Sequence, residues 1–235
     1  IYIKATAAGL TAACSTAVVI SPATATKLSF KTQPSGTGTA GTNLAQQPVV
    51  ELLDSFNNPV GAGTDAITLG AYTDASCTSA SSGTFNVTTN PENAVLGEAT
   101  FAGVGHEKVE TIYIKATAAG LTAACSTAVA ISHAAADHIT VTTEPVDTAS
   151  GGTIFITAEI RDAFENLVTT NDDATANITL SLVAGTGSLA GTLTKAASSG
   201  AVSFGVGEGV NIATAGTGKQ IRLTKSDESS GSGTG

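Results

Sequence analysis

Three cysteines, Cys14, Cys77 and Cys125, are the first residues of this sequence with chemistry of their own. Two thiols can form a disulfide, thiolates with histidine bind zinc, and one activated thiolate acts as a nucleophile. No histidine lies at ligand spacing from any of the three, which disfavours a metal site and a Cys/His nucleophile. The residue types alone leave two alternatives, disulfides in an oxidising compartment or unpaired thiols on strands.

The remaining reactive side chains form no catalytic pattern. His133 and His138 flank Asp137, which allows either a metal shared across a linker or, more simply, solvated side chains. His106 is isolated in a predicted loop. The glycine-rich stretches lie between predicted strands and open no helix, so they do not match a phosphate-binding loop. We predict no catalytic residue, no metal ion and no cofactor, and hence no enzyme activity.

A short acidic motif occurs twice, as DSFNNPV at 54–60 and DAFENLV at 162–168. An Asp that closes a strand can accept hydrogen bonds from turn amides, and Asn tolerates positive φ. A calcium site at either Asp is the alternative, but the repeated acidic spacing of a calcium loop is missing. We therefore interpret four residues as structural turn residues: Asp54, Asn58, Asp162 and Asn166.

Two glycosylation sequons are present, Asn86-Val-Thr88 and Asn177-Ile-Thr179. In a secreted archaeal or eukaryotic protein Asn86 and Asn177 would be glycan sites, whereas in most bacteria they would remain unmodified.

The charge balance excludes several classes of partner. The chain has 19 acidic and 10 basic residues, a formal net charge of −9, and only 12% of its residues are charged. Such a chain is repelled by nucleic acid and by anionic membrane surfaces. No apolar run approaches the roughly 20 residues that span a bilayer. We therefore predict no nucleic-acid partner and no membrane span in this segment.

An internal repeat sets the structural unit. Residues 1–18, IYIKATAAGLTAACSTAV, recur unchanged at 112–129, and a diverged copy of residues 28–114 follows at 139–223. A unit of about 110 residues with many short strands is typical of a β-sandwich. Small changes in the offset indicate loop insertions and deletions on a shared scaffold.

Alternating hydrophobicity predicts which strand faces are buried. Apolar residues recur at every second position in Leu28/Phe30, Ile67/Leu69/Ala71 and Ile112/Ile114, and in their second-unit counterparts Ile139/Val141, Ile178/Leu180/Leu182 and Ile221/Leu223. This period of two is that of a strand with one buried face, and helical spacing is not sustained anywhere. The sequence therefore predicts an all-β chain of antiparallel β-sandwiches.

The repeat also predicts the domain boundaries. Residues 1–22 correspond to the last two strands of an upstream domain, 23–133 to a complete β-sandwich, and 134–235 to a second one without its final strand. Only Ser- and Gly-rich sequence follows Asp227.

The odd number of cysteines is explained by the same repeat. Cys125 belongs to the closing strand of the complete domain, and Cys14 is its copy in the upstream one. We predict a Cys77–Cys125 disulfide, with Cys14 paired outside this segment, and an oxidising, extracytoplasmic location.

The order and spacing of these motifs resemble the bacterial immunoglobulin-like repeats of surface adhesins, invasin-like proteins and other large secreted arrays. The residues that carry the resemblance are LSFKTQP at 28–34, the turn at 54–60, GEATF at 97–101 and the closing strand pair at 112–131. The resemblance implies tandem immunoglobulin-like domains in an extracellular stalk, fibre or surface layer, with neighbouring copies or adjacent domains as partners.

The alternative is an adhesin module that binds a cell-surface protein or glycan. Sugar-binding surfaces usually need exposed aromatic rings, and the chain has only Tyr2, Tyr72 and Tyr113 as tyrosines and no Trp. Within the structural hypothesis, the surplus strand pair at 1–21 and a domain without its last strand could complement each other between molecules. Simple truncation of a longer chain explains the same facts with fewer assumptions.

Overall fold

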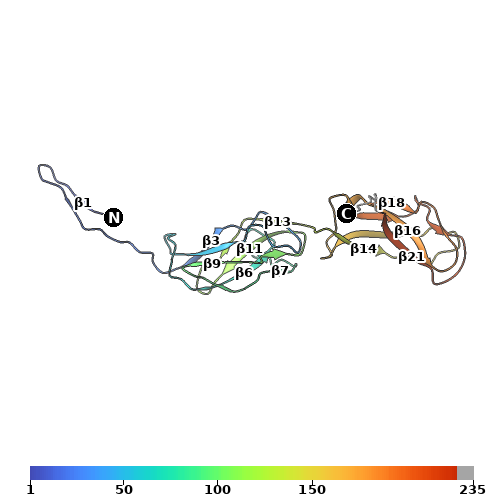
Figure 1. Cartoon of the computed structure of the whole chain (residues 1–235), viewed down its shortest axis with the longest axis horizontal. Coiled ribbons are helices and arrows are strands. Elements are labelled where there is room, and N and C mark those ends of the chain that lie inside the picture. Colours follow the sequence, from blue (N-terminus) through green and yellow to red (C-terminus); the bar gives the residue numbers. More distant parts are fainter. Residues whose placement is uncertain (227–235) are drawn as a thin grey trace, which may run out of the picture.

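The protein is built of strands throughout. A computed structural model describes residues 1–226, and Figure 1 shows three parts in a row: an N-terminal hairpin, a first unit and a second unit. A single 3-10 turn, η1 (Asp173–Thr175), interrupts the strands of the described residues. The all-β prediction is therefore confirmed.

The N-terminal hairpin projects from the first unit and packs on no other element within residues 1–226. Its strands β1 (Lys4–Ala5) and β2 (Ala13–Cys14) pair Lys4 with Cys14 and Ala5 with Ala13. Backbone bonds between Ile1 and Val18 and between Ile3 and Ser15 extend this pairing. All residues from 1 to 24 are exposed.

The first unit consists of two main sheets. One contains β3 (Lys27–Thr32), β5 (Val49–Leu53) and β9 (Glu98–Thr100) in the order β3-β5-β9. The other has the order β4-β13-β11-β6-β8, with β12 also paired to β11. Its strands are β4 (Thr37–Thr39), β6 (Ala66–Tyr72), β8 (Glu92–Asn93), β11 (Thr111–Thr117), β12 (Ala124–Cys125) and β13 (Val129–Ser132). A short pair, β7 (Phe85–Asn86) and β10 (Gly105–His106), lies beside them.

The core of the first unit lies between these two sheets and follows the predicted alternation. Leu28 and Phe30 on β3 face Ile67 and Leu69 on β6 across one continuous apolar cluster, and Ile112 and Ile114 on β11 are fully buried. The last strand contributes as well, because Val129 and Ile131 on β13 are buried in the same cluster. Burial of these side chains is the main stabilising term of the unit.

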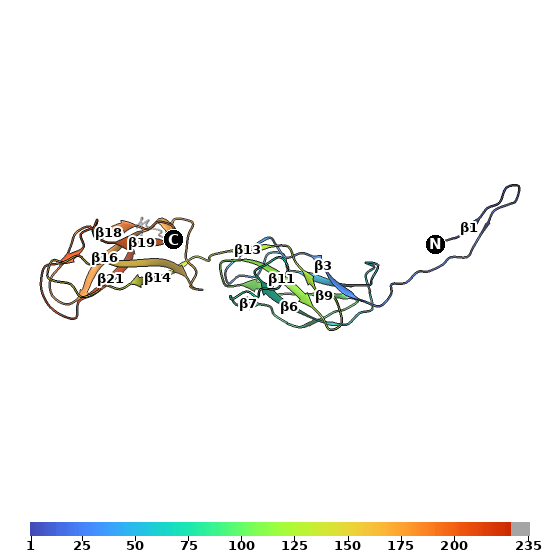
Figure 2. The same cartoon turned by 180° about the vertical axis from the view of Figure 1, so that it is seen from behind.

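The second unit repeats this plan with fewer strands, as Figure 2 shows from behind. One sheet has the order β14-β15-β19 and the other β18-β16-β21, with a short pair β17-β20. The strands are β14 (Ala136–Thr143), β15 (Ile156–Asp162), β16 (Asn177–Ala184), β17 (Leu189–Ala190), β18 (Thr194–Ala196), β19 (Ala201–Phe204), β20 (Asn211–Ile212) and β21 (Gln220–Ser226). A separate core includes Ile156, Leu180 and Phe204.

The second unit differs from the first at one edge. In the first unit β11 is flanked by β6 on one side and by β12 and β13 on the other. Within residues 1–226, β21 pairs with β16 alone, and no counterpart of β4, β12 or β13 is present. The predicted stop of this domain after Asp227 lies outside the described residues.

Among the described residues, no helix is long and apolar enough to cross a membrane.

Candidate functional site

The first of the two acidic turns lies where the chain enters the first unit. Asp54 is 1% exposed, and its carboxylate accepts hydrogen bonds from the backbone of Phe56 and Asn58 and from Asn58 Nδ2. Its second oxygen accepts the amide of Ala23, at 3.0 Å, from the linker that follows the hairpin. The Asn58 side chain, together with these amides, lowers the pKa of Asp54 from 3.8 to about 2. The Asp54 carboxylate therefore connects the linker to the turn by hydrogen bonds to both.

The second turn ties the other linker in the same way. Asp162 accepts the amides of Phe164 and Asn166 and the side chain of Asn166, and its Oδ2 accepts the amide of Ala134 at 2.8 Å. Burial alone would raise the pKa of Asp162, but the bonds from Ala134 and Asn166 outweigh it, so the pKa lies below its ordinary value. Ala23 and Ala134 are 111 residues apart, the offset of the repeat.

The second turn also forms the contact between the two units. Asn166 Nδ2 donates to the carbonyl of Glu107 at 2.7 Å, and Asn166 Oδ1 accepts the amide of Val109 at 2.9 Å. The ring of Phe164 lies on Gly41, where a Cβ would come within 1.9 Å of Cζ. Gly41 has a φ of +72°, so this position needs glycine both for its backbone and for the ring that covers it.

The equivalent aromatic ring of the first turn is exposed. Phe56 is 77% exposed, compared with 37% for Phe164, because no described unit precedes the first one at that end. Phe56 is thus exposed at the position where its counterpart Phe164 contacts the preceding unit.

The histidines of the linker region make local contacts. His133 bonds Thr170 Oγ1 at 2.8 Å through Nε2, and His138 lies 3.0 Å from Asp137 and 3.3 Å from Glu165. The part of the chain that the structure describes contains no group of three or more His, Cys, Asp or Glu placed to hold a metal. His133 and His138 therefore make polar contacts with side chains of the second unit.

His106 was expected in a loop, but the structure places it on β10 with no exposed surface. Its Nε2 lies 3.2 Å from Ser81 Oγ and 2.8 Å from Glu110 Oε1, while Ser81 Oγ donates to the same carboxylate at 2.6 Å. Burial raises the pKa of Glu110, but the bonds from Ser81 and His106 lower it more. A catalytic triad would need the acid on Nδ1 and the serine on Nε2. Here both share Nε2, and Nδ1 has no partner among residues 1–226, so the cluster holds β10 to neighbouring loops.

The disulfide lies on one edge of the first unit. Cys77 and Cys125 are bonded, with their Cα atoms 6.2 Å apart. Cys77 is fully buried with a φ of +51°, and its carbonyl accepts Lys115 Nζ at 3.0 Å. The bond fastens β12, and with it the last part of the unit, to the loop after β6. Cys14 is exposed and bonded to no other described cysteine.

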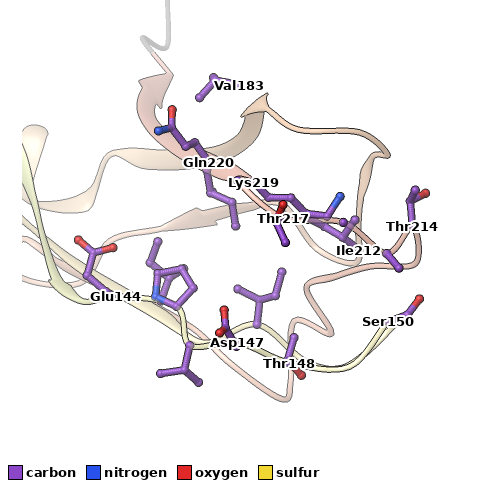
Figure 3. Close-up of a pocket in the computed structure, with 18 of the residues that line it drawn as sticks. Glu144, Asp147, Thr148, Ser150, Val183, Ile212, Thr214, Thr217, Lys219 and Gln220 are labelled. Atoms are coloured by element: carbon purple, nitrogen blue, oxygen red, sulfur yellow. The ribbon is translucent and has the colours of Figure 1, made fainter.

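A groove opens along the edge of the second unit where strands are fewer. Its volume is about 1050 Å³. Figure 3 shows Glu144, Asp147 and Thr148 along one side and Lys219 and Gln220 along the other. Apolar side chains, Ile154, Ile156, Ile212 and Ile221, line its floor. Ile221 and Leu223 on β21 are only half-buried, whereas Ile112 and Ile114 on β11 are fully buried. Ile154, Ile156 and Ile212 on the floor are at most 7% exposed. The apolar surface that the groove opens to solvent therefore comes mainly from its other lining residues, including Val146 at 77% and Val183 at 45% exposed.

The two sequon asparagines are both half-buried at strand positions. Asn86 ends β7, where its Nδ2 donates to Glu107 Oε1 at 3.2 Å, and Asn177 begins β16. Their modification stays a prediction.

Sequence reasoning located the turns and the cysteine pair but missed two features. The contact of Phe164 and Asn166 with the preceding unit had no sequence signal, because its partners are a glycine and two backbone groups. The buried cluster around His106 joins residues up to 29 positions apart in the sequence. A single histidine without a neighbouring motif does not predict such a cluster.

Comparisons with known proteins do not assign a family. No protein-family model and no curated protein matches the chain. Among solved structures, the crystal structure of β-glucuronidase from Parabacteroides merdae aligns with 88% of this chain and 25% of its own, at 11% identity and a TM-score of 0.22. The chain thus spans about a quarter of that enzyme's length, and a likeness at this level carries no argument about fold or function.

Proposed function

We propose that this chain is a non-catalytic structural segment of an extracellular stalk, fibre or surface layer built from tandem immunoglobulin-like β-sandwiches. The observation that carries the proposal is the joint between the units. The Asp162 carboxylate holds the linker amide of Ala134, while Asn166 and Phe164 hold the end of the preceding unit. A joint with fixed contacts transmits force and direction, which a flexible linker does not.

The immunoglobulin-like assignment is supported by the arrangement of each unit. In each unit two sheets, antiparallel except for the parallel β4–β13 pair of the first unit, enclose one core. The order β3-β5-β9 in one sheet of the first unit matches β14-β15-β19 in the second unit. The repeated motifs at equivalent turns add to this support, because they lie at the same junctions in both units.

The extracellular location is supported by the Cys77–Cys125 disulfide, since such bonds persist in oxidising compartments. Sparse charge and an acidic balance agree with a chain that binds neither nucleic acid nor anionic lipid. Adjacent units and neighbouring copies are the partners that this role requires.

Pulling single molecules between their two ends tests the proposal. A structural segment should unfold in two separate force peaks, one for each unit, after a stiff initial response. Reduction should then lengthen the extension released by the first unit by roughly 160 Å, because the 48-residue separation between the cysteines becomes free at ~3.5 Å per residue. Units that unfold without measurable resistance would reject the structural role. Tight, saturable binding of one glycan or cell-surface protein would favour the adhesin alternative.

A further inference from the structure

We propose that residues 13–21 of one copy of this chain complete the second unit of another copy, lying as a final strand in the groove beside β21. Repetition of this exchange joins copies head to tail. The inference rests on the proposed function, since it supplies a route by which such a segment assembles into a fibre.

The first unit shows how such a groove is filled. There β13 lies between β4 and β11, pairing Ile131 with Gly38 on one side and Ile112 with Val129 on the other. Ile131 lies over Gly38 beside Leu44, and its amide donates to Glu110. The groove of the second unit occupies the same place between the chain at 147–150 and the start of β21.

Backbone bonds establish which residues of the two units correspond. Leu44 N donates to Val104 O in the first unit, and Ile154 N donates to Val210 O in the second, each at 2.8 Å. Ile154 therefore takes the place of Leu44, the residue next to Ile131. It lines the groove, where a strand carrying an isoleucine at the position of Ile131 would cover it.

Residues 13–21 are such a strand. They read ACSTAVVIS, and residues 124–132 read ACSTAVAIS. Val129 and Ile131 are 0% and 5% exposed in the first unit, whereas their copies Val18 and Ile20 are 41% and 72% exposed on the free hairpin. To enter a groove, residues 13–21 give up their few bonds to residues 1–5. An isolated two-stranded hairpin is marginal in water, so this loss is small beside the apolar burial gained.

The linker after the strand has the length that the joint requires. Ser132 ends β13, and Ala134, two residues later, is bound by Asp162. Ser21 is the copy of Ser132, and Ala23 is bound by Asp54. A strand seated in the groove therefore places the donor's first unit on the acceptor's second unit as the two units sit within one chain.

That placement brings two exposed surfaces together. Phe56, the copy of Phe164, would meet Gly151, which corresponds to Gly41. Gly41 N donates to His106 O and Gly151 N to Ile212 O, each at 3.0 Å, and their φ angles are +72° and +76°. Gly41 is covered by a ring, whereas a Cβ on Gly151 would meet nothing within 4 Å. The exposed ring and the uncovered glycine are the two halves of one joint.

Residues 13–21 of one molecule lie far from the groove of that same molecule, so the donor proposed here belongs to a second copy. In Figures 1 and 2 the hairpin and the second unit lie at opposite ends of the chain, with the first unit between them. A contact between different surfaces of two copies is heterologous, so it propagates rather than closing on itself as an isologous pair does.

Sedimentation of the full chain over a range of concentrations, with electron microscopy of the same samples, tests the exchange. We expect linear oligomers with a repeat of two units. Val18→Asp with Ile20→Asp should abolish them, because both side chains would be buried in the groove. Val19→Asp is the matched control, since its counterpart Ala130 is exposed, and it should leave the oligomers intact. Phe56→Ser should weaken association at least tenfold. A chain that stays monomeric, or equal effects of the Val19 and Val18/Ile20 variants, would overturn the inference.

A peptide of residues 11–22, added to the full-length Val18→Asp/Ile20→Asp variant in reducing buffer, tests the groove directly. The variant keeps its groove open, so one peptide should bind per chain and shift the NMR signals of Ile154 and Ile221. The same peptide with both Asp substitutions should not bind. Absence of binding by the unmodified peptide would reject the inference. A chain that stays monomeric but still unfolds with two force peaks would also reject the strand exchange. It would leave the proposed structural role in place.

Discussion

The two buried aspartates show how one side chain can serve a turn and a linker at once. Asp54 and Asp162 each accept amides from the turn that follows them, which the motif predicted. Each also accepts an amide from about 30 residues upstream, which no local pattern could reveal. The sequence thus identified the residues but only half of their role, because the second donor is brought close by the fold.

Acid should remove the contribution of Asp54. Its pKa is lowered from 3.8 to about 2 in the folded state, so the stabilisation is complete above about pH 4 and is lost as the pH falls towards 2. Asp54→Asn should therefore lower the urea midpoint of the first unit at pH 7. The difference in midpoint between the unsubstituted protein and the variant should shrink towards zero as the pH falls to about 2. Urea unfolding followed across this range measures it, with Asp65→Asn as a control outside the turn. A difference that does not depend on pH would contradict the assignment.

Strand faces were more predictable than strand register. The residues expected to face the core of the first unit are buried, because a period of two is set by the backbone itself. The sequence alignment matched Leu69 with Leu180 and Ile114 with Leu223. In the structure Leu69 pairs with Ala116, but Leu180 pairs with Leu223. A shift by two residues keeps every side chain on its face, so hydrophobic pattern alone cannot detect it.

The disulfide is expected to stabilise the first unit alone. It closes a loop with a sequence separation of 48, for which loss of chain entropy in the unfolded state corresponds to about 3–4 kcal/mol. Reduction, or Cys77→Ser with Cys125→Ser, should lower the free energy of unfolding of that unit by this amount. The second unit, with no disulfide among its described residues, provides an internal reference in the same denaturation experiment. A change of equal size in the unfolding transitions of both units would show that the disulfide does not stabilise the first unit alone.

At the scale of the whole molecule, the repeat predicts where one unit gives way to the next, but it does not predict the joint. A repeat offset says where one unit ends and does not say what the next unit touches. The partners of Phe164 and Asn166 are backbone groups and a glycine, and such groups leave no signature in composition or periodicity. The groove and its apolar floor became evident only in three dimensions, because the lining combines residues between 141 and 222.

The stiffness of the joint should depend on Asn166 in a way that Asn58 does not share. Both side chains bond the Asp of their own turn, but only Asn166 also bonds Glu107 and Val109 of the preceding unit. Asn166→Ala should broaden the distribution of angles between the units, whereas Asn58→Ala should cost a similar ~1 kcal/mol within its turn and leave the angle unchanged. Small-angle scattering and NMR relaxation of monomeric samples distinguish the two. Equal broadening in both variants would show that the joint is held by other contacts.

The joint has a genetic consequence. Its parts recur at fixed places in each unit: a linker amide, an acidic turn, an aromatic ring and a receiving glycine. Inserting or deleting one unit therefore creates no joint of a new kind. Residues 1–18 recur unchanged at 112–129. Where the DNA that encodes the two segments is equally similar, unequal recombination between them adds or removes a whole unit in register. In the tandem array proposed above, the length of the array would then change with copy number while the fold of each unit stays the same.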